Sequence, residues 1–89
     1  MNVVNVVQKF GADDFLERSW ELPSEMIEPL REHVNVGEDG WIIDAWPMTK
    51  QIAAIVQPRV TEHIDVASGA WFVESWCGPE QVQLPCLSL

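Results

Sequence analysis

The stretch Asn2-Val-Val-Asn-Val-Val-Gln-Lys-Phe10 decides the fold class of this chain. Its four valines come in two pairs, and such a β-branched run is typical of a well-buried strand. Gly11 ends the run, and the segment from Asp13 moves from a turn into alternation, with Trp20 and Leu22 on one face and Glu21 on the other. We therefore expect a second strand over residues 17–22 that forms a hairpin with the first.

An amphipathic helix is expected after Pro23. Its apolar face at helical spacing comprises Met26, Ile27, Leu30 and Val34. Its acidic outer face comprises Glu25, Glu28 and Glu32. Ser24 is suited to cap the first free N–H groups, and Pro29 predicts a kink or a helix that becomes regular only from Glu28. Gly37 and Gly40 then bracket a predicted turn.

The second half of the chain contains one more helix and an aromatic strand. Thr49 is expected to cap a helix whose buried face carries Ile52, Ile55 and Val56 and which ends near Pro58. The run from Ala70 to Trp76 predicts a strand, and alternation around Val82 and Leu84 predicts a short edge strand that Pro85 blunts. The run from Trp41 to Trp46 fits either a short strand or an ordered loop.

These elements predict one α+β domain over residues 1–89, with a small, mostly antiparallel sheet and about two helices packed on one face. The chain length of 89 residues leaves room for one core. The N-terminus has no positively charged region followed by an apolar run, and no stretch is long and apolar enough for a membrane span. We therefore expect a cytoplasmic protein that does not engage a membrane.

The chain carries 14 acidic and five basic residues, which leave a formal charge of −9. This charge repels nucleic-acid phosphates and anionic lipids, and it attracts a basic protein. We expect a basic protein partner and no direct nucleic acid binding. Ten of the acidic residues lie between Asp13 and Asp44, so the first half of the chain is the expected source of the negative electrostatic field.

The sequence offers little for catalysis or for a cofactor. The candidate metal ligands His33, His63, Cys77 and Cys86 are too far apart in sequence to form a recognisable site. Ser68 lies near His63 and Asp65 but lacks a nucleophile elbow, and no phosphate-binding glycine loop is present. We expect a protein that is not an enzyme and needs no metal or other cofactor. A bridge between Cys77 and Cys86 is left open.

The five tryptophans divide into core and contact candidates. Trp20, Trp71 and Trp76 alternate on predicted strands and are expected mainly in the core, whereas Trp41 and Trp46 flank Asp44 in the undecided segment. An exposed aromatic ring beside carboxylates is suited to anchor a protein interface. The predicted partner-binding residues are Glu25, Glu28, Glu32, Glu38, Asp39, Trp41, Asp44 and Trp46.

The order of several short segments resembles that of the small acidic bacterial immunity proteins, which inhibit cognate toxins. These segments are Trp20-Glu-Leu-Pro-Ser-Glu25, Leu30-Arg31, Asp39-Gly-Trp-Ile-Ile-Asp44, a helix and Trp71-Phe-Val-Glu-Ser75. The resemblance covers most of the chain. It implies a cytoplasmic, non-catalytic protein that binds its toxin tightly and blocks the active site or a neighbouring surface. The acidic charge is compatible with a nuclease as the toxin, because a nuclease has a basic cleft that carboxylates can cover.

Two alternatives belong to other functional classes. A phage-type DNA mimic that inhibits a host defence nuclease is expected to present carboxylates in a long double row, whereas the acidic residues here thin out after Asp44. A small ligand-binding domain or enzyme requires a convergent set of polar residues, which the sequence does not reveal.

Overall fold

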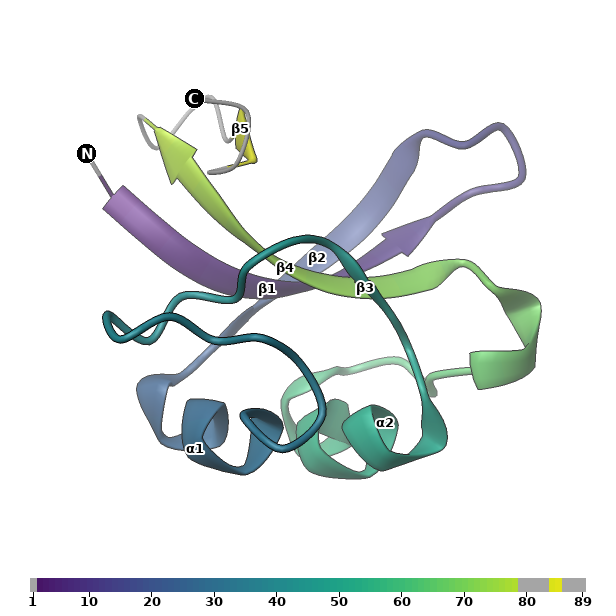
Figure 1. Ribbon diagram of the computed structural model, residues 1–89. Helices are drawn as coiled ribbons and strands as arrows, with labels where there is room; N and C mark the ends of the chain where they lie inside the picture. Colours follow the sequence, from purple (N-terminus) through teal and green to yellow (C-terminus); the bar gives the residue numbers. More distant parts are fainter. Residues whose placement is uncertain (1, 79–83, 86–89) are drawn as a thin grey trace.

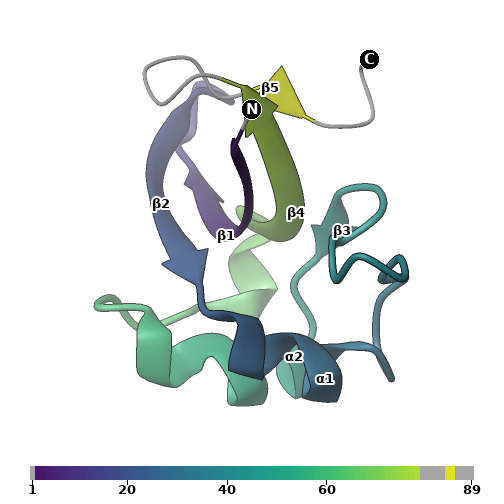
Figure 2. The ribbon, with the colours of Figure 1, turned by 90° about the vertical axis from the view of Figure 1, so that its left-hand side faces the viewer.

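The computed structural model describes residues 2–78 and 84–85, and these form a curled antiparallel sheet above two short helices (Figures 1 and 2). The strand order is β2-β1-β4-β3, and β5 also pairs with β4. The strands are β1 (Asn2–Phe10), β2 (Leu16–Leu22), β3 (Trp46–Pro47), β4 (Trp71–Gly78) and β5 (Leu84–Pro85). Both helices lie on the same face of the sheet, which confirms the predicted α+β class.

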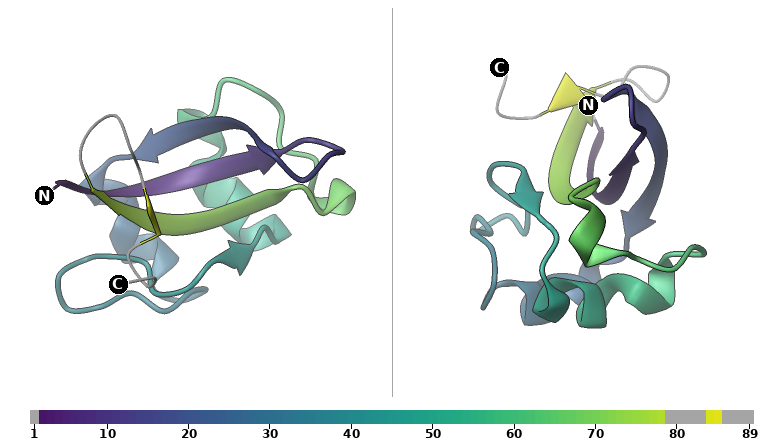
Figure 3. Two further views of the ribbon diagram at one scale, coloured as in Figure 1. Left: turned by 90° about the horizontal axis from the view of Figure 1, so that it is seen from above. Right: turned by 90° about the vertical axis from the view of Figure 1, so that its right-hand side faces the viewer.

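Strand β1 lies between β2 and β4, as the view from above shows (Figure 3). Val7 on β1 is opposite Trp20 on one side and Val73 on the other. The consecutive residues Val6, Val7 and Gln8 are all buried, so both faces of β1 are covered at its centre. This position explains the valine-rich composition of residues 2–10, and it confirms the predicted hairpin with residues 17–22.

The helix-facing side of the sheet is built around two stacked tryptophans. The rings of Trp20 and Trp71 lie 5.5 Å apart between centroids, with an angle of 18° between their planes. Trp20 is also hydrogen-bonded, since its Nε1 donates to Thr61 Oγ1 over 2.9 Å. The buried residues that complete this core from the helical layer and its connections include Ile27, Leu30, Val34, Ile52, Val56, Val60 and Ile64.

Cationic side chains continue the aromatic stack at the edge of the core. Arg18 lies 4.8 Å from the Trp20 ring centroid, and Lys9 Nζ lies 5.8 Å from that of Trp71. Lys9 also pairs with Glu62 and with Glu17, and hydrogen bonds to these carboxylates raise the pKa of Lys9 above its usual value of 10.5. A raised lysine pKa favours folding at all pH values below it, so this contribution persists through neutral pH.

The segment after Pro23 differs in detail from the prediction. A 3-10 turn over Ser24–Met26 precedes α1 (Ile27–Leu30), and Ser24 makes no capping hydrogen bond, so the predicted cap is wrong. Pro29 has no amide hydrogen to offer the carbonyl one turn earlier, which favours the tighter turn before α1. The predicted burial is confirmed, because Ile27, Leu30 and Val34 are buried and the three glutamates are exposed. The predicted length is wrong, because α1 ends at Leu30 and Val34 follows it in a turn segment.

Helix α2 (Lys50–Val56) begins as the sequence predicts. The Thr49 hydroxyl oxygen accepts a hydrogen bond from the Ile52 amide over 3.2 Å, and a 3-10 turn containing Pro58 follows the helix. None of the helices in residues 2–78 has the length and apolar character needed to cross a membrane. Val82 and Cys86 lie outside the described residues, so the full predicted edge strand and the Cys77–Cys86 pairing remain predictions.

Trp71→Ala should lower the free energy of unfolding by about 3–5 kcal/mol, because it removes a buried ring and leaves a cavity under β1. The measurement is equilibrium unfolding in urea. Phe15→Ala is the control, since Phe15 is 73% exposed and its loss should change stability by no more than about 0.5 kcal/mol. Equal effects of the two substitutions would contradict a core centred on the stacked tryptophans.

Candidate functional site

Residues 35–43 form a small hairpin, here called the 35–43 hairpin, which lies beside the start of β1. Its backbone is closed by hydrogen bonds from Ile43 N to Asn35 O and from Gly37 N to Trp41 O, both 2.9 Å. Gly40 N donates to Gly37 O, and Gly40 has a φ of 86°, a region that favours glycine. The predicted Gly37–Gly40 turn is therefore confirmed, and it places Glu38 and Asp39 at the tip.

Side chains alternate along the second arm of this hairpin. Ile42 is 3% exposed and belongs to the core, whereas its neighbours Trp41 and Ile43 are 41% and 39% exposed. The arm pairs with the first through the single bridge Val36–Ile42. The undecided run from Trp41 to Trp46 is thus mainly an ordered loop, and one face of it presents two apolar side chains to solvent.

Asn5 on β1 anchors the hairpin through both ends of its amide group. Its Nδ2 donates to Gly40 O over 2.9 Å, and its Oδ1 accepts from Ile42 N over 3.0 Å. The same oxygen accepts a hydrogen bond from Ser75 Oγ, and Ser75 is buried on β4. These bonds hold the backbone on both sides of Trp41, so the position of the indole is tied to the central strand.

Arg31 provides a second link, between α1 and the 35–43 hairpin. Its Nε donates to Glu28 Oε1 over 3.1 Å, and its Nη1 donates to the carbonyl oxygens of Val36 and Gly37 over 3.3 Å each. The guanidinium therefore satisfies acceptors from both elements. Arg31 holds the end of the helical segment against the base of the turn.

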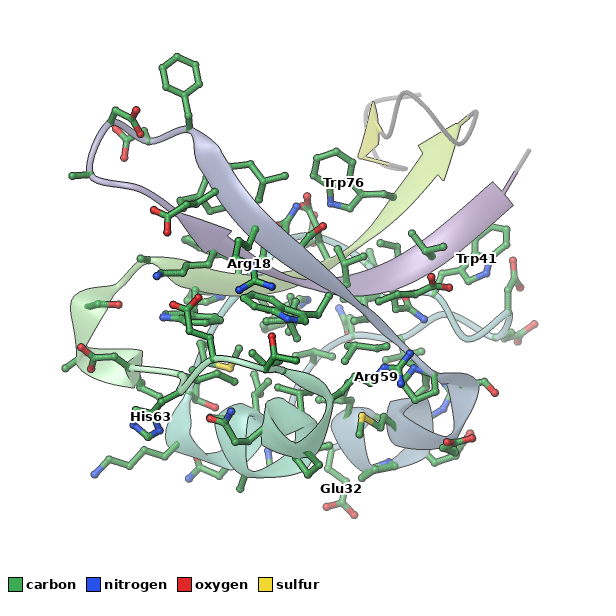
Figure 4. The ribbon with its side chains drawn as sticks, turned by 180° about the vertical axis from the view of Figure 1, so that it is seen from behind. Arg18, Glu32, Trp41, Arg59, His63 and Trp76 are labelled. Carbon is green, nitrogen blue, oxygen red and sulfur yellow. The ribbon has the colours of Figure 1, made fainter. Side chains whose placement is uncertain are left out.

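A groove of about 500 Å³ opens between the start of β1, the end of β2, α1 and the 35–43 hairpin. Its apolar lining comprises Val3, Val4, Leu22, Pro23, Ile27 and Trp41. Its charged lining comprises Glu21, Glu28, Glu38, Asp39 and Arg31, an excess of three negative charges. Figure 4 shows Trp41 beside the beginning of β1, on the side of the molecule away from His63. The groove thus has a mixed polar and apolar lining and an acidic net charge.

The structure brings together some of the predicted binding residues and separates others. Glu28, Glu38, Asp39 and Trp41 line the groove. Glu25 and Glu32 are exposed but do not line it, and Figure 4 shows Glu32 pointing away beneath the helices.

The other two predicted residues belong to the connection into β3. Asp44 is exposed, has a φ of 70° and does not line the groove. Trp46 is half-buried against the core, and its Nε1 donates to Ile43 O over 2.6 Å. Of the two tryptophans predicted to contact a partner, Trp41 is therefore the one with the more accessible ring.

Sequence reasoning missed Glu21, Arg31 and the exposed Ile43. Glu21 lies on the polar side of a predicted strand, and nothing in the sequence indicates that this strand end and the turn at Gly40 line the same groove. Arg31 follows Glu28 by three residues, a spacing at which helical side chains meet, and this relation could have identified the ion pair. Alternation around buried Ile42 could have identified Ile43.

The other candidate chemistry does not converge in the described part of the chain. No group of three His, Cys, Asp or Glu residues there could hold a metal ion. Ser68 Oγ donates to Asp65 O over 2.8 Å, and the Asp65 carboxylate accepts from Ala67 N over 3.2 Å. These two side chains therefore stabilise the turn before β4.

A comparison with protein-family models finds no match to this chain, and searches of curated proteins and of solved structures find none either.

Asn5→Ala should lower the free energy of unfolding by about 1–3 kcal/mol, because the Ile42 amide and the Gly40 carbonyl lose their partner. It should also speed hydrogen exchange of the Ile42 amide, measured by NMR. Asn35→Ala is the matched control, since the Asn35 side chain is exposed on the same hairpin. An unchanged exchange rate at Ile42 in Asn5→Ala would show that the amide group does not anchor the hairpin.

Proposed function

We propose that this protein is a bacterial immunity protein that binds and inhibits a cognate toxin in the cytoplasm, without catalysis of its own. The observation that carries the proposal is the groove beside Trp41, whose lining combines four carboxylates, an accessible tryptophan and several aliphatic side chains. The resemblance of the sequence to immunity proteins points the same way. The partner is a protein with a basic surface, such as the substrate cleft of a nuclease.

Charge supports this proposal through the rate of association. The groove has one guanidinium among its lining residues, and that group is already paired with Glu28. Carboxylates on both sides of the groove therefore act on an approaching partner together with the overall charge of −9. Complementary fields of this kind raise association rates by roughly 10- to 1,000-fold at low salt.

Apolar contact also supports the proposed binding, because such contact slows dissociation of a complex. Trp41 and Ile43 project from the same hairpin and are both more than a third exposed. Tryptophan is enriched among the residues that dominate interface energies, and differences in affinity among related interfaces arise mostly in dissociation. Charge and aromatic contact thus contribute to different steps of the same binding reaction.

The fixed position of the 35–43 hairpin supports the proposed binding as well. Asn5 and Arg31 hold the 35–43 hairpin by hydrogen bonds to its backbone, so the turn is already ordered before a partner arrives. Ordering a mobile loop on binding costs free energy, and a loop ordered in advance avoids that cost.

The DNA-mimic alternative requires carboxylates in an extended row. Glu38 and Asp39 lie at one turn, whereas Glu32 points away beneath the helices (Figure 4). This separation favours a local contact site over a DNA-like row. The alternative remains an outcome of the partner experiment, in which a defence nuclease would be recovered.

The proposed inhibition can be tested with two baits. The wild-type chain and a Glu38→Gln/Asp39→Asn/Trp41→Ala variant, each tagged, are used to capture partners from the source bacterium. We expect a basic toxin on the wild-type bait that is depleted on the variant. The purified toxin should then lose its activity at about one equivalent of the wild-type chain.

A captured protein that binds both baits equally, or whose activity persists at saturation, would contradict the proposal. Circular dichroism and urea unfolding of the variant serve as the control for folding. All three substituted side chains are exposed, so the fold should be retained.

Kinetics with the purified partner separate the two contributions. Glu38→Gln/Asp39→Asn should slow association and reduce its salt dependence, because two charges are removed from the groove. Glu25→Gln/Glu32→Gln removes the same charge from outside the groove and should have the smaller effect. Trp41→Ala should speed dissociation by about tenfold or more, as expected for a residue worth over 1 kcal/mol. Surface plasmon resonance at several salt concentrations measures both rates.

Two results would count against the groove as the contact site. One is an equal loss of association rate in Glu38→Gln/Asp39→Asn and in Glu25→Gln/Glu32→Gln, which would reflect net charge alone. The other is an unchanged dissociation rate in Trp41→Ala.

A further inference from the structure

The groove beside Trp41 has a lining that is divided in chemistry. Leu22 and Ile27 are buried, and Val3 and Val4 are half-buried, so these four side chains give a mixed lining its apolar part. The carboxylates of Glu21, Glu38 and Asp39 are exposed residues around it. This division suits a side chain with an apolar stem and a cationic head, because the stem can cover apolar surface while the head stays among polar groups.

The three outer carboxylates have free hydrogen-bonding capacity within the described part of the chain. Glu28 is engaged by Arg31, but Glu21, Glu38 and Asp39 have no side-chain hydrogen bond or ion pair among the described residues. Arg59 approaches this end of β2, yet its Nε donates to the backbone oxygen of Glu21 and leaves the carboxylate unused (Figure 4). A cationic ligand would therefore find acceptors that the fold itself does not use.

Two internal contacts show how this chain holds a guanidinium. Arg31 combines one carboxylate with two backbone carbonyls at the edge of the groove. Arg18 lies 4.8 Å from the ring centroid of Trp20. Trp41, which is 41% exposed as a residue, offers another indole ring, and Glu38 and Asp39 offer carboxylates on the adjacent turn.

Arginine meets these features better than lysine does. Its planar guanidinium stacks on aromatic rings and donates several hydrogen bonds in a fixed fork, whereas the lysine ammonium is compact and strongly hydrated. A groove of about 500 Å³ also lies within the range of roughly 300–1,000 Å³ usual for small-ligand sites. The groove is therefore large enough for one side chain, and binding can be tested with a short peptide that contains a single arginine.

We propose that the groove between α1 and the 35–43 hairpin receives one arginine side chain of the partner protein, with its stem on the apolar lining and its guanidinium between Trp41 and the turn carboxylates. The inference rests on the proposed function for its source of arginine, but its test requires only peptides.

The test is an NMR titration of the labelled protein with the blocked tripeptide acetyl-Gly-Arg-Gly-amide. We expect saturable shifts of the Gly40 amide and of the Trp41 indole N–H resonances. The indole resonance of Trp41 is identified as the one that is missing from the spectrum of Trp41→Phe. The same peptide with lysine at its centre should bind at least threefold more weakly. The peptide with neutral citrulline should give no saturable shift, because it keeps the shape of arginine and loses the charge.

Matched variants locate the site. Trp41→Ala should weaken binding of the arginine peptide by about threefold or more, consistent with a cation–π contact at a partly exposed site. The double variant Glu38→Gln/Asp39→Asn should weaken peptide binding more than Trp41→Ala does. The double variant Glu25→Gln/Glu32→Gln, with the same change in net charge, should leave the affinity within twofold of wild type.

Equal binding of the arginine and lysine peptides overturns the choice of arginine. No saturable shift, or equal losses in the two double variants, overturns the groove as its site. These failures are distinguishable from failure of the proposed function, because groove-dependent toxin inhibition can persist when the isolated peptides do not bind. Conversely, peptide binding without any inhibited partner supports the arginine site and counts against the immunity role.

Discussion

Strand β1 is paired along both of its edges, and the remaining elements are arranged around that constraint. Val7 lies between Trp20 and Val73, and the stacked rings of Trp20 and Trp71 fill the helix-facing side next to it. Asn5 precedes Val7 by two residues and faces the same side, because side chains alternate along a strand. The strand that organises the core therefore also holds the 35–43 hairpin.

The amide of Asn5 couples stability to the presentation of the groove. A half-buried polar side chain is tolerated when its donor and acceptor are both used, and Asn5 uses both. An apolar residue there would leave backbone groups of the hairpin without partners. The cost of polarity next to the core is thus offset by a defined position for Trp41, and Arg31 adds a second constraint from the helical side.

Most of the secondary structure could be predicted because it follows from local patterns. Paired valines indicated β1, Thr49 indicated the start of α2, and helical spacing identified Leu30 as buried. The late start of the regular helix could be predicted from Pro29, whereas the Ser24 cap was wrong and α1 ends at Leu30 instead of reaching Val34. Within the candidate site, Glu38, Asp39 and Trp41 could be grouped because one turn contains them, whereas Glu21 and Arg31 come from other elements.

The sequence by itself determined the α+β class, the buried faces of both helices, the acidic outer face of the first and the net charge of −9, because these depend on composition and on periodicities of a few residues. Only the tertiary structure decided which carboxylates share a groove and which tryptophan is accessible beside it. Those outcomes depend on contacts between distant segments, such as the bond from Asn5 to Gly40 across 35 residues. Such a bond leaves no periodic trace in the sequence, since it joins a strand to a loop only after the sheet has formed.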